Sequence, residues 1–291
     1  MARAKLKHFE GGNVQNKQDW LTVRRGQAPL VVSIPHTGLE IPAPYDQHLV
    51  SLWRARKDAD WHIERLYDFA HHFDATIIHT SISRTVIDVN RDPSGQSLYP
   101  GQATTDLCPS TTFDGEPLYQ SGHESDQASI NERKAKYFDP YHAALGHEID
   151  RLRRQHQTVV LYDCHSIRSV IPRLFEGTLP HLNLGTNSGA SCAPELANSL
   201  LEAAADMPAF THIHNGRFKG GYITRAFGKP SEGVHAVQME MACRTYMPEP
   251  LGDVDLKNWP QPYDEHYAAP AIELLKIWFN LCLDFAARHS L

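Results

Sequence analysis

The chain has 291 residues, and its 28 Lys and Arg against 34 Asp and Glu give a formal net charge of −6. This balance argues against a general nucleic-acid binder, because neutralising phosphates requires a basic face. With 41% hydrophobic and 21% charged residues, the composition is that of an ordinary soluble globular protein that can bury a sizeable core.

Short runs rich in β-branched residues predict buried strands at 29–34, 75–80, 85–89, 158–163 and 234–239. Apolar residues at helical spacing predict helices within 63–73 and 138–152, and a C-terminal helix at about 266–288. The alternation of the two kinds of element predicts an α/β protein with a mixed or largely parallel sheet that helices cover on both faces.

The segment at about 92–126 interrupts this alternation, since it is rich in Gly, Pro, Ser and Thr and has no sustained period. Loops of this length often serve as lids or binding loops, and the alternative is a disordered segment. The chain contains no repeat or linker composition, so we expect one domain over 1–291. The N-terminal residues lack the apolar core of a signal peptide, and no stretch has the ~18 consecutive apolar residues that span a bilayer.

The numbers and spacing of cysteine and histidine indicate which kinds of site the chain can form. The five cysteines are odd in number, widely spaced and without a Cys-x-x-Cys pair, which argues against a disulfide framework and favours a reducing, cytoplasmic setting. The 18 histidines are an unusually high count, and imidazole is the side chain most used for metal ligation and for proton transfer near neutral pH.

Three of the predicted strands lead into polar residues: His36 follows the first, His165 the fourth and Glu240 the fifth. In open α/β sheets the ligand crevice lies beyond the carboxyl ends of the strands, so we expect these side chains at one rim. For each histidine alone, the alternative is a half-buried ring that the backbone satisfies.

Such a set suits zinc, which in hydrolases takes three protein ligands from His, Asp and Glu and leaves a fourth position for water. His36 and His165 are the natural imidazole ligands. The third ligand is Asp60, which otherwise makes a helix N-cap, or Glu40, four residues after His36. Weaker substitutes for these ligands are His62 and His79.

Glu240 would carry a charge at the end of an apolar run, where burial without a partner is costly. A glutamate beside zinc-bound water can take its proton and return it to the leaving nitrogen during amide hydrolysis. The alternative for Glu240 is an ion pair with one of the arginines.

Two basic segments are candidates for binding an anion. In 83–91, a period of two places Arg84, Asp88 and Asn90 on one side of an extended segment, with Arg91 at its end. Arginine matches a carboxylate bidentately, so Asn90 and Arg91 can clamp an anionic substrate, whereas Arg84 and Asp88 are expected to pair with each other. The cluster 215–225, which includes Arg217, adds three glycines that either admit a ligand or form a turn.

Six short motifs occur in order between residues 29 and 247, and together they make a specific signal. They are SIPHTG at 33–38, DWH at 60–62, SRTVIDVNR at 83–91, DCHS at 163–166, RFKGGYITR at 217–225 and HAVQME at 235–240. With these motifs the chain resembles the N-formylglutamate amidohydrolases, the deformylases of bacterial histidine degradation.

That family is similar in fold to the zinc carboxypeptidases, which implies a three-layer α/β/α domain around a mixed, largely parallel sheet. It also implies an order of roles: two histidine ligands, an Asn-Arg pair for the substrate carboxylate, and a glutamate base. The positions that follow this order are His36, His165, Asn90, Arg91 and Glu240. The carboxypeptidase spacing would put the acidic ligand at position 39, which is Leu39 here, so either Asp60 or Glu40 replaces it or the site is built differently.

The resemblance implies hydrolysis of N-formyl-L-glutamate to formate and L-glutamate, with one divalent ion, most simply zinc, on His36, Asp60 and His165. Glu240 is the expected general base and acid. The groups expected to bind the substrate carboxylates are Arg91, Asn90, Arg84 and Arg217. A small dianion is the expected partner, with no nucleic acid and no membrane. The alternatives are a deacylase of another N-acyl acidic amino acid and a non-catalytic binder of acidic amino acids.

Overall fold

The computed structural model describes residues 19–250 and 252–289, so the stretch used to argue against a signal peptide lies largely outside the described residues. One seven-stranded sheet has the order β1-β3-β2-β4-β7-β5-β6. The strands are β1 (Leu21–Arg24), β2 (Leu30–Ile34), β3 (Thr76–Thr80), β4 (Val159–Ile167), β5 (Leu182–Gly185), β6 (His212–His214) and β7 (Val234–Ala242). The central strands β3, β2, β4 and β7 run parallel, whereas β1 is antiparallel to β3 and β5 is antiparallel to β7.

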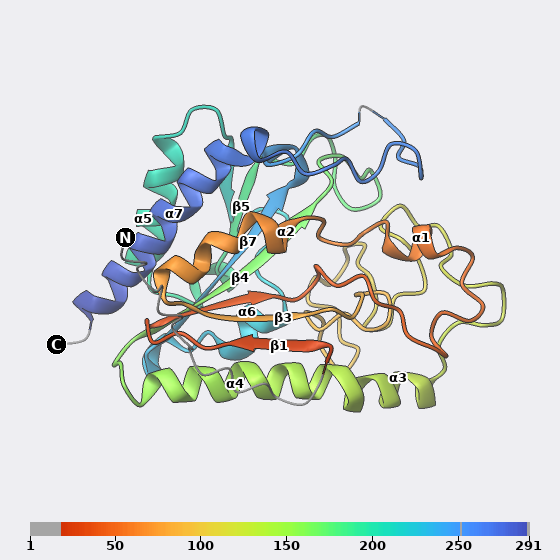
Figure 1. Ribbon diagram of the computed structural model, residues 1–291, viewed down its shortest axis with the longest axis horizontal. Helices are drawn as coiled ribbons and strands as arrows, with labels where there is room; N and C mark the ends of the chain where they lie inside the picture. The colour runs from red at the N-terminus through yellow and green to blue at the C-terminus, as the bar shows by residue number, and fades with distance from the viewer. Residues whose placement is uncertain (1–18, 251, 290–291) are drawn as a thin grey trace, which may run out of the picture.

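Helices cover both faces of this sheet, which confirms the predicted α/β class (Figure 1). They are α1 (Leu52–Arg56), α2 (Ile63–Leu66), α3 (Gln127–Arg133), α4 (Asp139–Arg153), α5 (Pro194–Ala205), α6 (Tyr222–Phe227) and α7 (Glu265–Arg288). A π-helical turn, η2 (Lys134–Phe138), joins α3 to α4, and the short 3-10 helices are η1 (Asp68–Phe73), η3 (Asn187–Gly189), η4 (Pro230–Glu232) and η5 (Cys243–Thr245). Among the helices described, none has the length and apolar character needed to cross a membrane.

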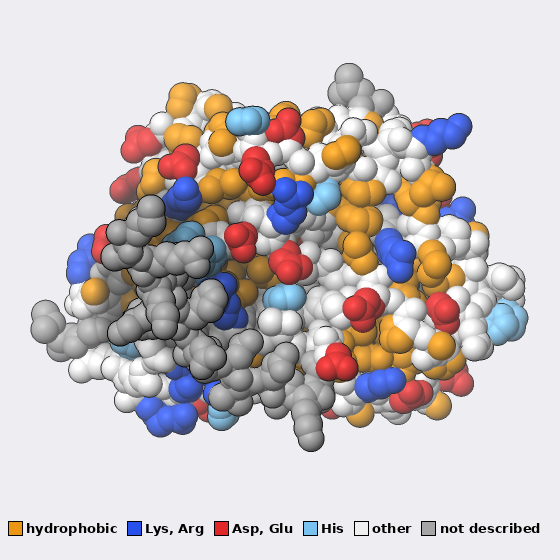
Figure 2. Space-filling model, viewed as in Figure 1, with side chains coloured by type: hydrophobic (Ala, Val, Ile, Leu, Met, Phe, Trp, Pro, Cys, Tyr) orange, Lys and Arg blue, Asp and Glu red, His pale blue; other side chains and the backbone are white. Residues whose placement is uncertain are grey.

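The core lies on both sides of the sheet because successive strand residues point to opposite faces. On β2, Leu30 and Val32 pack into the cluster that includes α2, α5 and α7, whereas Val31 packs into the cluster under α4. Burial on both faces explains the unbroken apolar runs of the central strands. On the outer surface in Figure 2, acidic and basic side chains are interspersed outside the grey atoms.

The strands predicted at 29–34, 75–80, 158–163 and 234–239 are confirmed, although two of them continue further. The strand predicted at 85–89 is wrong, because this buried segment is a succession of turns. The Ser83 hydroxyl accepts a hydrogen bond from the backbone N–H of Thr85, and Asp88 Oδ1 accepts one from the N–H of Asn90. Such local bonds between side chain and backbone favour turns over a strand ladder.

The segment 92–126 contains no helix or strand and lies beside α1 at the right of Figure 1. It is fixed to the end of α1 by polar contacts. The backbone N–H of Phe113 donates to Asp58 Oδ2 at 2.6 Å, and Lys57 Nζ lies 2.5 Å from Asp114 Oδ2. This segment therefore packs as one wall of the region beyond the carboxyl ends of the central strands.

Candidate active site

The face of the sheet that packs under α4 changes from apolar to polar toward the carboxyl ends of β4 and β7. The polar side chains on this face are Asp163 and His165 of β4 and Gln238 and Glu240 of β7. His165 and Glu240 are partners in the register of the two strands. The strands thus extend through the residues predicted to follow them, and regular backbone places both side chains at one rim.

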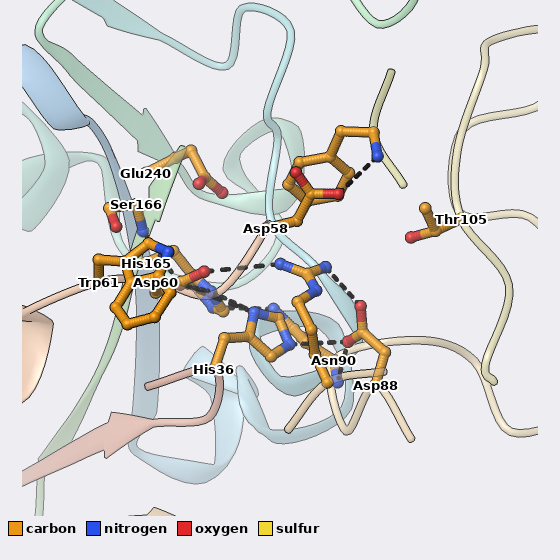
Figure 3. A network of polar contacts seen from close by, with 12 residues as sticks. His36, Asp58, Asp60, Trp61, Asp88, Asn90, Thr105, His165, Ser166 and Glu240 are labelled. Atoms are coloured by element: carbon orange, nitrogen blue, oxygen red, sulfur yellow. Dashed lines mark hydrogen bonds and ion pairs between the residues drawn. The ribbon is translucent and has the colours of Figure 1, made fainter. Parts of the chain in front are cut away.

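Three buried side chains point toward one another at this rim: His36, Asp60 and His165 (Figure 3). The two Nδ1 atoms are 3.2 Å apart, and Asp60 Oδ2 lies 3.3 Å from Nδ1 of His165 and 3.7 Å from Nδ1 of His36. The ligands of a tetrahedral zinc ion, each about 2.0–2.1 Å from the metal, are about 3.3 Å apart. The three atoms therefore fit the donor set of a single metal ion.

Asp60 reaches this position from the loop between α1 and α2. Its backbone N–H donates to the carbonyl of His36 at 3.0 Å, and its Oδ2 accepts from the N–H of Ser166 at 3.0 Å. The N-cap of α2 is His62, so the alternative capping role of Asp60 is wrong. Glu40 is exposed and lies outside the cluster. Neither weaker substitute joins it: His62 bonds to the carbonyl of Gln261, and His79 lies near Glu64.

In each imidazole, Nδ1 faces the cluster and the other nitrogen, Nε2, contacts a carboxylate. Nε2 of His36 is 2.8 Å from Asp88 Oδ1, and Nε2 of His165 is 2.8 Å from Asp163 Oδ2. With the proton on Nε2, each ring presents an unprotonated Nδ1 to the cluster, the usual arrangement of metal-binding histidines. Arg84 Nη2 in turn donates a hydrogen bond to Asp88 Oδ2 at 2.6 Å, which confirms the predicted pairing of these two residues.

The cluster has an excess of negative charge. The carboxylates around it are Asp60, Asp88, Asp163 and Glu240, against the guanidinium groups of Arg84 and Arg91. Burial alone would raise the pKa of Asp60, but the neighbouring imidazoles outweigh it and hold this pKa below its usual value. Burial likewise opposes a charged His165, but Asp163 raises its pKa well above the usual range. Together these groups surround the two imidazoles and Asp60 with carboxylates, an environment that favours a cation.

Glu240 is the remaining carboxylate that faces the cluster. Its side chain is buried, and its Oε2 accepts a hydrogen bond from Gln238 Nε2 at 3.2 Å. Within the described part of the chain it forms no ion pair, so the alternative of pairing with an arginine is not observed. Burial raises the pKa of Glu240 to about 7, against the lowering effect of His165. A carboxyl with such a pKa suits both the uptake and the return of a proton.

A cavity opens onto the cluster, and its lining includes Arg91, Arg217 and Glu240. Arg217 donates to the carbonyls of Ala103 and Leu174 at 2.7 and 2.8 Å, and no carboxylate pairs with it among residues 19–250 and 252–289. Arg91 lies 3.6 Å from Asp88 and donates to the carbonyl of Thr105. The cavity therefore carries at least one guanidinium group without an anionic partner.

Asn90 also lines the cavity, with its Nδ2 2.9 Å from His165 Nε2, and its Oδ1 accepts a hydrogen bond from the N–H of Ile223. A Cβ on Gly221 would lie 2.4 Å from Asn90 Nδ2, so this glycine of the 215–225 cluster is needed for a close approach between two protein segments. Asp163 was not among the predicted site residues. Its position two residues before His165, on the same face of a strand, is the signal that identifies it.

The fold and the site together define an α/β protein in which a buried His-Asp-His cluster can hold a metal ion beside a carboxylate and an arginine-lined cavity. A model of the family described as N-formylglutamate amidohydrolase matches residues 28–247. The chain belongs to this family, which confirms the resemblance found in its motifs.

Individual relatives agree with this assignment. The chain is 44% identical over 273 residues to an N-formylglutamate deformylase of Pseudomonas putida, covering 92% of this chain and 97% of that one. It is 46% identical over 229 residues to an N-formylglutamate deformylase of Pseudomonas aeruginosa, covering 79% and 86%. The crystal structure of N-formylglutamate amidohydrolase from Ralstonia eutropha JMP134 superposes with a TM-score of 0.73 at 22% identity, covering 92% and 98%, which shows a shared fold.

Proposed function

We propose that this protein hydrolyses N-formyl-L-glutamate to formate and L-glutamate. Two relatives that cover most of the chain are N-formylglutamate deformylases. The observation in the site that carries the proposal is Arg217, a cavity-lining cation without a carboxylate partner in the described part of the chain, beside Arg91. A substrate with two carboxylates supplies the anionic partner that Arg217 lacks and a second carboxylate for Arg91, and a buried site concentrates the field of these arginines.

We infer that His36, Asp60 and His165 hold one divalent ion, with zinc as the best match to two imidazoles and a carboxylate. When bound, such an ion acts as a Lewis acid that polarises a carbonyl oxygen and makes water more acidic. Glu240 takes the proton of the attacking water and passes it to the amide nitrogen, so that the C–N bond breaks and formate and the free amine are released. Asp88 and Asp163 keep the two imidazoles oriented throughout.

In this proposal Arg91 and Arg217 bind the two carboxylates, and Asn90 positions Arg91, whose Nη1 donates to the Asn90 carbonyl at 3.3 Å. Arg84 also lines the cavity, but its guanidinium group lies 2.6 Å from Asp88 and 3.5 Å from Asp60. Its contribution is therefore to hold these carboxylates in place and to add positive charge near the substrate.

We propose that this reaction is the last step of a histidine-degradation route. A cytoplasmic setting is part of this proposal. It is supported by the five cysteines, which are all buried as free thiols.

Arg217→Ala is expected to lower kcat/KM for N-formyl-L-glutamate at least about 30-fold, because removing one partner of a buried charge pair costs ~2 kcal/mol or more. Formate release by the wild type and the variant measures this. Arg225→Ala is the matched control, since the guanidinium group of Arg225, like that of Arg217, lies over the ring of Tyr99, but Arg225 does not line the cavity. An unchanged kcat/KM in Arg217→Ala would contradict the assigned role.

A further inference from the structure

Phe113 and Ile167 form a wall between two cavities. One side faces the active-site cavity, and the other faces a small cavity of about 10 Å³, roughly the room for one water molecule. These are the two side chains that line both cavities. The small cavity shares Lys57 and Arg168 with an outer cleft of about 770 Å³. Phe113 and Ile167 thus separate the active-site cavity from the small cavity, and Lys57 and Arg168 lie between the small cavity and the outer cleft.

This wall borders the metal-binding cluster. Ile167 follows His165 by two residues on β4, so both side chains leave the same face of the sheet. The ring of Phe113 lies 4.7 Å from the guanidinium carbon of Arg84, whose Nη1 is 3.5 Å from Asp60 Oδ1. Arg91 and Arg217 donate to the loop carbonyls of Thr105 and Ala103, and Arg217 also donates to the carbonyl of Leu174, which packs against the apolar cluster of Phe113 and Ile167.

The orientation of the substrate follows from these positions. The acyl carbon is the atom that water attacks, so it must lie at the cluster. With the two carboxylates at Arg91 and Arg217, we place the substituent on the acyl carbon against Phe113 and Ile167, the apolar lining residues beside Arg84 and His165. In a formyl group this substituent is a single hydrogen atom, whereas an acetyl or propionyl group places carbon there.

Apolar packing and polar contacts fix the position of Phe113 in the wall. Phe113 is buried in one apolar cluster with Ile167, Ile171 and Leu179, and its N–H donates to Asp58 Oδ2 at 2.6 Å. The next residue, Asp114, lies 2.5 Å from Lys57 Nζ and 2.7 Å from Arg168 Nη2. A closely packed and anchored side chain does not give way to extra methylene groups without strain.

We propose that Phe113, together with Ile167, restricts the acyl group to formyl by closing the acyl end of the active site. The inference rests on the proposed deformylase function. The chemistry itself is the same for any acyl length: water adds its hydroxyl group to the acyl carbon, the C–N bond breaks, and a proton goes to the nitrogen. Only the fit of the acyl substituent decides which amide is hydrolysed.

The test compares kcat/KM for N-formyl-, N-acetyl- and N-propionyl-L-glutamate in the wild type and in Phe113→Ala. The propionyl-to-formyl ratio is expected to rise at least tenfold in the variant, since one methylene group in a pocket changes specificity by about 10–200-fold. Ile167→Ala is expected to shift the ratio in the same direction. Phe175→Ala is the matched control, because Phe175 packs in the same apolar cluster but lines neither cavity, and its ratio is expected to stay unchanged.

Formyl activity with unchanged ratios in Phe113→Ala and Ile167→Ala would overturn this inference and leave the deformylase function standing. If Phe113→Ala does not fold, Phe113→Leu and Ile167→Ala decide the question by the same ratio. A wild type that hydrolyses none of the three substrates would overturn the proposed function and this inference with it. A general loss of packing lowers the rates on all three substrates together. A change in the propionyl-to-formyl ratio therefore distinguishes a role in acyl selectivity from a purely structural role.

Discussion

Glu240→Gln is expected to lower kcat for formate release at least about 100-fold while the metal content of the protein stays unchanged. Glutamine keeps the size of the side chain and can still accept the hydrogen bond that Gln238 donates to Glu240. It cannot take a proton from water and return it to the amide nitrogen. Because Glu240 forms no ion pair with any described residue, the substitution leaves no charged partner uncompensated.

Steady-state kinetics together with metal analysis of the purified variant measures this effect. The metal content is the internal control, because it shows that the neighbouring His36, Asp60 and His165 are undisturbed. A kcat close to that of the wild type would remove Glu240 from the mechanism. A fall in metal content parallel to the fall in rate would instead make Glu240 part of the metal site.

Asp60→Asn is expected to weaken metal binding by more than about 100-fold, and activity is expected to fall with it. The carboxylate is the only anionic member of the His36, Asp60 and His165 cluster. Loss of a direct ligand should exceed the ~10–100-fold typical of outer hydrogen-bond partners of metal ligands. Asparagine keeps an oxygen to accept the N–H of Ser166, so the loop is expected to fold normally.

The measurement is titration of the metal-free protein with zinc, followed by formate release at saturating zinc. Asp68→Asn is the matched control, since the Asp68 side chain lies eight residues further along and is 79% exposed. Metal affinity equal to that of the wild type in Asp60→Asn would exclude Asp60 as a ligand.

Much of the candidate site follows from local sequence patterns. His36, His165 and Glu240 lie at the ends of apolar runs that pair in parallel, and the carboxyl ends of such strands must meet at one edge. The pairing of Arg84 with Asp88 is also local, since the two residues are four positions apart. These positions were predictable because strand pattern and short spacing alone fix them.

Other positions depend on contacts between distant segments. The choice of Asp60 over Glu40 rests on the hydrogen bond from the backbone of Asp60 to the carbonyl of His36, which no periodicity shows. Phe113 reaches the site from an irregular segment, and the carboxylate that anchors it, Asp58, is 55 residues away in the sequence. The segment 85–89 has the composition of a strand, but bonds from Ser83 and Asp88 to the nearby backbone make it a series of turns.

The metal dependence of the proposed deformylase reaction is tested most directly by the metal content of the purified protein, combined with formate release from N-formyl-L-glutamate before and after chelation. We expect about one divalent ion per chain, loss of activity on chelation, and recovery when a divalent metal is added back. Activity that persists after complete removal of metal would mean that His36, Asp60 and His165 serve another purpose, and the proposed mechanism would have to be abandoned.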